Sequence, residues 1–223
     1  MPGTTVYSQN MQGGSNVAFA TGQIARHQVV MLQECGHPGF MSSLAPVPGL
    51  PGVSMGQHNF GTRTRPVERT IIHHSSGRCS QALIIDEEMG APVPFLVPAP
   101  APTLRPMLGG AVGGDAYASF HAPSGNHNAA RGVLMSQTTL VTNMGYNSFL
   151  LAGDANSDIL KQERPGLVHA YAAGGATHQG GGHLDGMMSS VNRSGEVRNI
   201  GMNASDHVGI SANMLGAPAR RRP

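Results

Sequence analysis

Asp154 and Asn156 stand two residues apart, directly after an apolar run over residues 149–152 that is typical of a buried strand. A carboxylate and a carboxamide at the end of a strand are suited to hold a metal ion, a phosphate group or their own turn. The run from Asp154 opens with the residue types of a calcium-binding EF-hand loop. Such a loop needs Gly at its sixth position and Glu at its twelfth, where this chain has Ile159 and Pro165. The EF-hand interpretation is excluded, and the other three stay open.

Polar residues of the kinds used in catalysis stand at the ends of several other strand-like runs. Their oxygen ligands suit Mg²⁺ or Mn²⁺ better than Zn²⁺, and their imidazole rings can transfer protons near neutral pH. If neighbouring strands bring these ends to one edge of a sandwich, a single cleft would hold a cation site with acid–base groups beside it. The residues concerned are Asn10, Glu34, His121, Asp154, Asn156, Asp185, Asp206 and His207.

Short strands and two helices would position these residues. Fully apolar cores predict strands buried on both faces, and the expected strands cover residues 4–10, 28–34, 69–74, 81–86, 115–121, 147–154, 184–190 and 206–212. Periodic apolar residues predict one helix over 15–26 and a better one over 128–143, capped by Asn126 or Asn128. The face of the second helix expected to be buried comprises Val133, Leu134, Gln137, Leu140, Val141 and Met144.

Segments rich in Pro and Gly separate these elements. Six prolines between residues 91 and 106 exclude a central strand and favour a surface loop with an edge strand over 95–97. Residues 46–52 and 174–183 are likewise expected to be loops. Many short strands without regular strand–helix alternation indicate two stacked sheets with helices outside. We expect one domain over residues 1–217, followed by a basic tail over 218–223.

The composition limits the kind of ligand and the location. Lys161 is the only lysine among 14 cationic residues, and the planar fork of arginine suits phosphate oxygens. Because the formal net charge is only +2, any site for a polyanion must be a local cluster. No apolar run approaches the ~20 residues that a membrane span requires. The first ten residues lack the basic start and apolar core of a secretory signal, so we expect a cytosolic protein or a mature form whose signal has been removed.

Eight short motifs follow one another in an order that resembles the endonuclease/exonuclease/phosphatase superfamily, and within it the catalytic B subunits of cytolethal distending toxins. They are 10-NMQGGS-15, 30-VMLQECG-36, 58-HNFGTRTRP-66, 104-LRP-106, 119-SFHAPSG-125, 152-AGDAN-156, 181-GGHLD-185 and 205-SDHVGI-210. The pattern G-T-R-x-R-P is the one most particular to the toxin subunit. The resemblance implies a deoxyribonuclease-I-like fold: a four-layer α/β/β/α sandwich of two packed, mainly antiparallel β-sheets flanked by helices.

The resemblance also implies how a metal ion and the substrate would be held. Glu34 matches the metal-ligand glutamate of the family, with Asn10 beside it. Asp154 and Asn156 match the pair that orients the scissile phosphate and the attacking water. The expected metal is Mg²⁺, with Mn²⁺ and Ca²⁺ as alternatives.

The remaining catalytic positions are two histidines and two acids. His121 and His207 match the two catalytic histidines of the family, and which of them is the acid and which the base stays open. Asp185 matches the carboxylate that supports His207. Asp206 matches the acid that completes the site.

Four further residues are expected around this centre. Arg65 and Arg105 resemble the phosphate-contacting arginines of the toxin subunit, and Arg63 is expected to join them. Glu68 occupies the neighbourhood in which pancreatic-type enzymes have a glutamate that orients the first histidine, so it is a candidate partner of His121. A solvated surface position is the alternative for Glu68.

Three functions are compatible with these residues. The leading hypothesis is a secreted, toxin-like deoxyribonuclease that grips DNA by its phosphates, works with toxin delivery subunits and acts in the nucleus of a target cell. A phosphoinositide phosphatase would use the same metal and histidines, and a catalytically degenerate scaffold subunit is the third. Ala155 and Gly186 replace larger residues that are common in the family, which bears on substrate preference more than on the reaction.

Other residues with chemical potential give no compact pattern. His73, His74, His178 and His183 match no zinc-ligand spacing, so surface or loop roles are expected for them. Cys35 and Cys79 could pair or stay free, because two cysteines alone do not identify the redox compartment.

Overall fold

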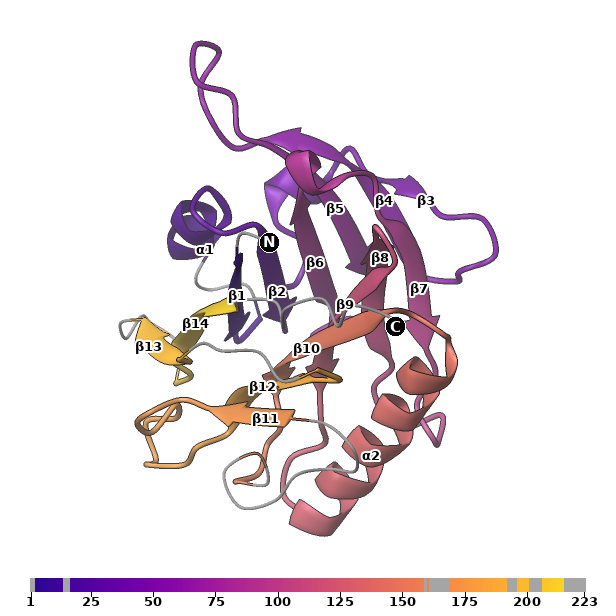
Figure 1. The fold of residues 1–223 in the computed structure, drawn as a ribbon, viewed down its shortest axis with the longest axis vertical. Coiled ribbons are helices and arrows are strands. Elements are labelled where there is room, and N and C mark those ends of the chain that lie inside the picture. Colours follow the sequence, from indigo (N-terminus) through magenta and orange to yellow (C-terminus); the bar gives the residue numbers. More distant parts are fainter. Residues whose placement is uncertain are drawn as a thin grey trace, which may run out of the picture.

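The computed structural model describes residues 3–13, 17–158, 160, 169–191, 196–200 and 206–214. Two β-sheets pack face to face, and one helix covers the outer face of each (Figure 1). The predicted four-layer sandwich is confirmed. The expected tail over 218–223 lies outside the described residues, and the single domain over 1–217 stays a prediction.

The larger sheet has eight strands in the order β13-β14-β1-β2-β6-β5-β4-β3. Neighbouring strands are antiparallel, except for the parallel pair β1 and β2. The carboxyl ends of β1 and β2 therefore lie at the same edge as the amino ends of β6 and β14. The strands are β1 (Thr4–Asn10), β2 (Val29–Gln33), β3 (Ala45–Pro46), β4 (Val53–Asn59), β5 (Glu68–His74), β6 (Gln81–Asp86), β13 (Arg198–Ile200) and β14 (Gly209–Met214).

The smaller sheet has six strands in the order β11-β12-β10-β9-β8-β7. Only β9 and β10 run parallel, and their last residues, His121 and Asp154, are direct partners in the register. Asp154 is also the partner of Asp185 on the antiparallel strand β12, so three polar residues meet at one edge. The strands are β7 (Val93–Val97), β8 (Met107–Val112), β9 (Asp115–His121), β10 (Ser148–Asp154), β11 (His169–Ala172) and β12 (Asp185–Ser189).

Burial on both faces explains why the central strands read as continuous apolar runs. In β2, Val29 and Met31 face the core between the sheets, whereas Val30 and Leu32 face the outer core under α1 (Val17–Ile24). Alternation of this kind follows from the two-residue period of a strand. A third apolar cluster packs α2 (His127–Asn143) on the smaller sheet. Two short 3₁₀ turns, η1 (Gly39–Met41) and η2 (Glu87–Met89), complete the described elements.

Helix α2 begins as predicted, but its buried face is narrower than expected. The side chain of Asn126 accepts the backbone N–H of Ala129 at 3.1 Å and caps the helix. Leu140 and Met144, expected to be buried, are 40% and 43% exposed. They lie beside the stripe that contacts the sheet, which comprises Ala130, Val133, Leu134, Gln137, Thr138 and Val141.

Several strands were not predicted, and β8 shows why. The sequence pattern of two adjacent glycines, Gly109 and Gly110, favours a loop over a strand. In the structure, both positions need glycine because neighbouring side chains leave no room for a Cβ. A Cβ on Gly109 would overlap the ring of Phe95, and one on Gly110 would lie 2.7 Å from Cδ1 of Ile72. Strands β3, β4, β11 and β13 were also missed, and β14 begins at Gly209 instead of residue 206. The predicted edge strand over 95–97 is confirmed within β7, which forms one edge of its sheet.

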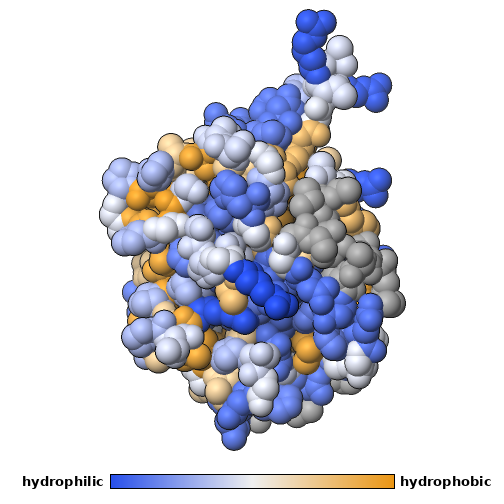
Figure 2. All heavy atoms as spheres, turned by 180° about the vertical axis from the view of Figure 1, so that it is seen from behind, coloured by the Kyte–Doolittle hydropathy of each residue, from blue (hydrophilic) through white to orange (hydrophobic). Residues whose placement is uncertain are grey.

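A hairpin over residues 60–67 joins β4 to β5 and projects from the body at the top of Figures 1 and 2. Within it Asn59 accepts the backbone N–H groups of Gly61 and Val67 at 2.8 and 3.0 Å. The register places Glu68 opposite Asn59, and Arg69 opposite Asp86. The hairpin therefore lies at the end of the sheet away from the carboxyl ends of β1 and β2.

Candidate active site

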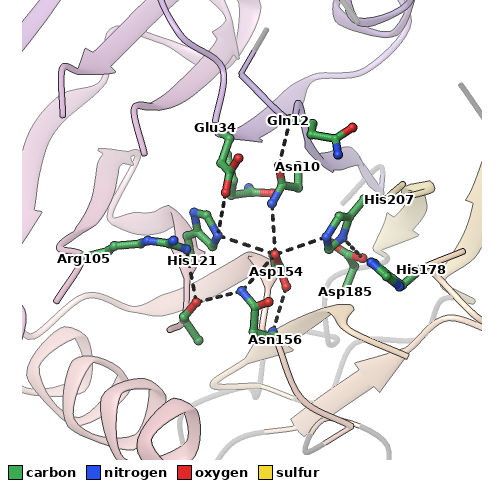
Figure 3. A network of polar contacts seen from close by, with 12 residues as sticks. Asn10, Gln12, Glu34, Arg105, His121, Asp154, Asn156, His178, Asp185 and His207 are labelled. Atoms are coloured by element: carbon green, nitrogen blue, oxygen red, sulfur yellow. Dashed lines mark hydrogen bonds and ion pairs between the residues drawn. The ribbon is translucent and has the colours of Figure 1, made fainter. Parts of the chain in front are cut away.

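Both sheets contribute polar residues to one cleft at a common edge of the sandwich (Figure 3). Asn10 ends β1 and Glu34 directly follows β2, while Asp206 and His207 precede β14. From the smaller sheet come His121, Asp154 and Asn156 on the cleft wall, with Asp185 behind them. Of the residues predicted from the sequence, the lining includes Asn10, Glu34, Arg105, His121, Asp154, Asn156, Asp206 and His207.

The backbone turns sharply where these residues enter the cleft. Among the described residues, Gln12, Glu34 and Asn156 are the non-glycine residues with positive φ, at 46°, 48° and 48°, and all three line the cleft. This region of the backbone costs free energy for residues with a Cβ, and such strain concentrates at functional sites. The positive φ angles at these three positions therefore coincide with the residues whose side chains line the cleft.

Asp154 both caps its own turn and faces the cleft. Its Oδ1 accepts the backbone N–H of Asn156 at 2.7 Å, which is the turn that the sequence left as one alternative. Its Oδ2 accepts side-chain amide N–H groups of Asn10 at 3.0 Å and of Asn156 at 3.1 Å. Gly153 makes this possible, because a Cβ there would overlap the carbonyl oxygen of Phe120 on the neighbouring strand.

Asp154 Oδ2 stands between the two predicted histidines. Nε2 of His121 lies 3.5 Å away and Nε2 of His207 lies 3.6 Å away (Figure 3). Burial raises the pKa of Asp154 to about 7, and the charge of Asp185 adds to this shift. The opposing effects of His207 and Asn10 are smaller. This carboxyl group is therefore poised to gain or lose a proton near neutral pH.

Asp185 forms a hydrogen bond with His207. Its Oδ2 lies 2.9 Å from Nδ1 of His207, so Nδ1 donates and Nε2 faces the cleft. Thr177 holds the acid in place, since its Oγ1 accepts the backbone N–H groups of Leu184 and Asp185. Burial lowers the pKa of His207, but the hydrogen bond and charge of Asp185, with smaller contributions from Asp154 and Asp206, outweigh it and raise that pKa to about 9.

His121 has the opposite electrostatic environment. Burial lowers its pKa well below the ordinary value, and the charges of Arg105 and His207 add to this. Its Nε2 also lies 3.6 Å from Oε1 of Glu34, whereas its buried Nδ1 has no hydrogen-bond partner among the described residues. One cleft thus contains a neutral and a protonated imidazole on two sides of the same carboxyl group.

The structure does not bring Arg63, Arg65 or Glu68 to the cleft, so the prediction that Glu68 contacts His121 is wrong, and the two arginines predicted to contact phosphate lie outside the cleft lining. Arg63 and Arg65 are exposed in the hairpin over 60–67, and Glu68 is exposed at the start of β5. The cleft lies at the other end of this strand, where His74 pairs with Gln81. Glu68 therefore cannot orient His121.

In the part of the chain that the structure describes, the arginines that line the cleft are Arg78 and Arg105. Nε of Arg78 donates to Oε2 of Glu34 at 3.2 Å from the turn between β5 and β6. Arg105 donates to the carbonyl of Ala122 at 3.3 Å, and Gln137 of α2 holds its backbone oxygen at 2.9 Å. Arg78 was missed because only the pairing of β2 with β6 places its turn beside Glu34.

Three further polar lining residues were also missed: Gln12, Ser124 and His178. Gln12 follows Asn10 in the motif N-M-Q-G-G-S, and its Oε1 accepts the backbone N–H of Asp206 at 3.4 Å. His178 was expected in a surface or loop role, yet its side chain faces Asp206. Nothing in its Gly-rich surroundings signals this position. Cys35 and Cys79, whose pairing was left open, are free thiols.

The donor set at this edge fits a hard cation bound through few protein ligands. Glu34 offers a carboxylate at the cleft, and Oδ1 of Asp206 has no hydrogen-bond partner among the described residues. Among the described His, Cys, Asp and Glu residues, two groups of three place their donor atoms within 4.8 Å of one another. One group is Asp154, Asp185 and His207, the other is His178, Asp206 and His207, and neither includes Glu34. Mg²⁺ commonly uses one or two carboxylates plus waters and substrate phosphate, so a single carboxylate at the cleft, such as that of Glu34, is compatible with its coordination.

Neither a protein-family model nor a curated protein sequence matches the chain. Solved structures do match it over almost its whole length. The cytolethal distending toxin of Actinobacillus actinomycetemcomitans is 21% identical with a TM-score of 0.75, and the match covers 95% of this chain and 98% of that one. For an endonuclease/exonuclease/phosphatase family protein from Leptotrichia buccalis, identity is 14%, the TM-score 0.58 and coverage 96% and 100%. The chain has the deoxyribonuclease-I-like fold.

A further structure with this fold, truncated TDP2 of Caenorhabditis elegans, is 16% identical with a TM-score of 0.62, covering 96% of this chain and 98% of that one. The deoxyribonuclease-I-like fold thus accounts for the architecture predicted from the sequence. None of the described helices is long and apolar enough to cross a membrane.

Replacing Asp185 by Asn should lower the pKa of His207 from about 9 toward or below the ordinary histidine range, because the acceptor charge is lost while burial persists. His207 would then lose at a lower pH the proton that it holds to about pH 9 in the wild type. NMR titration of the imidazole signals in metal-free protein measures this. His27, which bonds Gln23 and Ser211, should titrate unchanged as an internal control. An unaltered or higher pKa of His207 would contradict the supporting role of Asp185.

Proposed function

We propose that this protein is a metal-dependent phosphodiesterase, and specifically a toxin-type deoxyribonuclease that nicks DNA with little sequence preference. The observation that carries the proposal is the pair of imidazole Nε2 atoms, 3.5 and 3.6 Å from one oxygen of Asp154. Hydrolysis of a phosphodiester needs a proton taken from the attacking water and another given to the leaving oxygen. Two histidines on either side of one carboxylate can perform these transfers.

Each side chain of the site then has a task. One of the two histidines, His121 and His207, takes the proton from the water, and the other gives a proton to the leaving oxygen. Asp185 keeps Nε2 of His207 directed at the cleft by accepting a hydrogen bond from Nδ1. Asn10 and Asn156 hold Asp154 through their amide groups, so that its carboxylate can orient the water and the phosphate. General acid–base catalysis of this kind contributes roughly 10²- to 10⁴-fold to the rate.

Glu34 is the proposed main ligand of the metal, with Asn10 beside it. A bound Mg²⁺ would polarise the phosphate and relieve its negative charge. Mn²⁺ and Ca²⁺ share the preference for oxygen ligands and are the alternatives.

DNA is the proposed substrate because two guanidinium groups border the cleft. Arg78 and Arg105 can each give charge-assisted hydrogen bonds to phosphate oxygens, and such bonds hold the backbone without reading the bases. The toxin type is supported by the similarity to solved cytolethal distending toxins and by the motif G-T-R-T-R-P over residues 61–66. Secretion, delivery by partner subunits and action in a target-cell nucleus belong to the same proposal.

Nicking of supercoiled plasmid with and without EDTA, run beside phosphate release from phosphoinositides, tests this function. We expect metal-dependent nicking and little phosphate release. Phosphate release without nicking would replace the nuclease by a phosphoinositide phosphatase, which shares the metal and histidine chemistry. Absence of both activities would favour a scaffold subunit.

The arginines allow a comparison between the cleft and the hairpin. Arg78→Ala and Arg105→Ala should each weaken DNA binding and flatten its dependence on salt, by roughly 0.9 in log–log slope for each phosphate that is no longer neutralised. Arg65→Ala should leave both unchanged, because Arg65 lies at the other end of the sheet. Fluorescence anisotropy with a labelled duplex in EDTA measures affinity without cleavage. Weakening in Arg65→Ala equal to that in Arg78→Ala would contradict the assignment of the cleft as the DNA site.

A further inference from the structure

His178 is a third histidine at the cleft, and the backbone fixes its position. Gln179 N–H donates to the carbonyl of Asp206 at 2.9 Å, and Val208 N–H donates to the carbonyl of Thr177 at 2.7 Å. These bonds make His178 the antiparallel partner of His207. The two rings meet edge to face with centroids 5.1 Å apart. These backbone hydrogen bonds therefore hold the side chain of His178 next to Asp206 and His207.

A backbone hydrogen bond identifies the tautomer of His178. The N–H of Gly180 donates to Nδ1 of this ring at 2.9 Å, so Nδ1 carries a lone pair. In the neutral imidazole the proton then resides on Nε2. Nε2 lies 3.4 Å from Oδ2 of Asp206, which places a donor opposite an acceptor.

The same tautomer argues against a metal site at this point. His178, Asp206 and His207 offer donor atoms within 4.8 Å of one another, a grouping that could otherwise hold a transition metal. A metal needs the lone pair of Nε2, and in His178 that nitrogen bears the proton. His207 differs, because its Nδ1 donates to Asp185 and its Nε2 faces the cleft.

The orientation of Asp206 depends on this neighbour. Nε2 of His178 lies 3.4 Å from Oδ2 of Asp206. The other carboxylate oxygen of Asp206, Oδ1, has no hydrogen-bond partner among the described residues and lies 4.0 Å from Nε2 of His207. The side chain of Asp206 is 38% exposed, so packing alone does not fix its rotamer. We propose that His178 is a positioning residue, whose Nε2–H holds Asp206 so that the second carboxylate oxygen faces His207 and the cleft.

This role rests on the proposed phosphodiesterase function, and three variants test it through kcat and KM on a phosphodiester substrate. His178→Ala should lower kcat by roughly 10- to 100-fold, the usual loss when a group that orients an active-site residue is removed, with little change in KM. His178→Gln should restore most of the rate, because its terminal amide can occupy the place of Nε2–H. His178→Asn carries the same amide on a side chain one methylene shorter and should behave like Ala.

Three results would overturn the proposal: wild-type kcat in all three variants, equal losses in Gln and Ala, or a change confined to KM. A second measurement does not depend on activity. Long-range ¹H–¹⁵N NMR of the wild-type protein should show His178 as the Nε2–H tautomer, and an Nδ1–H tautomer would overturn the inference even in an active enzyme. If the wild type hydrolyses no phosphodiester, the proposed function fails, and the tautomer still decides whether His178 donates to Asp206.

Discussion

Plasmid nicking by Glu34→Gln is expected to fall almost to background in ordinary Mg²⁺ concentrations. The neutral amide keeps the size of the side chain but loses the charge that attracts a hard cation. Excess Mg²⁺ should partly restore the rate, since weakened binding is offset by mass action. Glu68→Gln is the matched control: the same change is made on β5 at the end of the sheet away from the cleft, so nicking should be unchanged.

The metal titration separates two explanations of a reduced rate. If Glu34 is a metal ligand, the Glu34→Gln variant needs more Mg²⁺ to reach half of its maximal rate. A variant that is inactive at every Mg²⁺ concentration, with unaltered metal affinity by calorimetry, would show that Glu34 acts in another way. Its hydrogen bond with Arg78 at 3.2 Å would then be the first alternative to examine.

His121→Ala and His207→Ala should each reduce the rate of nicking by at least ~10²-fold, as expected when a general acid or base is removed. Added metal should rescue neither variant, because imidazole is not a ligand in the proposed mechanism. Single-turnover rates on plasmid measure the effect without interference from product release. His37→Ala, which removes an exposed histidine outside the cleft lining, provides the control. Wild-type rates in both cleft variants would exclude the hydrolase and favour a scaffold subunit.

The sequence was informative about the strands that carry the site because most of them are buried on both faces. Such strands read as continuous apolar runs, so their ends, and hence Glu34, His121 and Asp154, could be placed to within a residue or two. The second helix was equally clear from its period and its cap, Asn126. Its outer residues Leu140 and Met144 show the limit, since periodicity does not give the width of the interface with the sheet.

The arginines were misplaced for a different reason. Arg63 and Arg65 belong to a motif that suggests phosphate binding, but only the order of the strands determines which end of the sheet a hairpin reaches. The pairing of β2 with β6 brings Arg78 to Glu34 and sends the hairpin to the opposite end. His178 depends likewise on a backbone bridge to His207, which is distant in the sequence, and no local pattern signals such a bridge.

Strand β14 pairs antiparallel with β1, Thr4 opposite Met214, so the last described strand of the chain lies beside the first. Asp206 and His207 precede β14 and follow the other described cleft residues in the chain. During translation, Asn10, Glu34, His121 and Asp154 therefore all emerge from the ribosome before the second histidine exists. A nascent or prematurely terminated chain lacks half of the proposed proton-transfer pair.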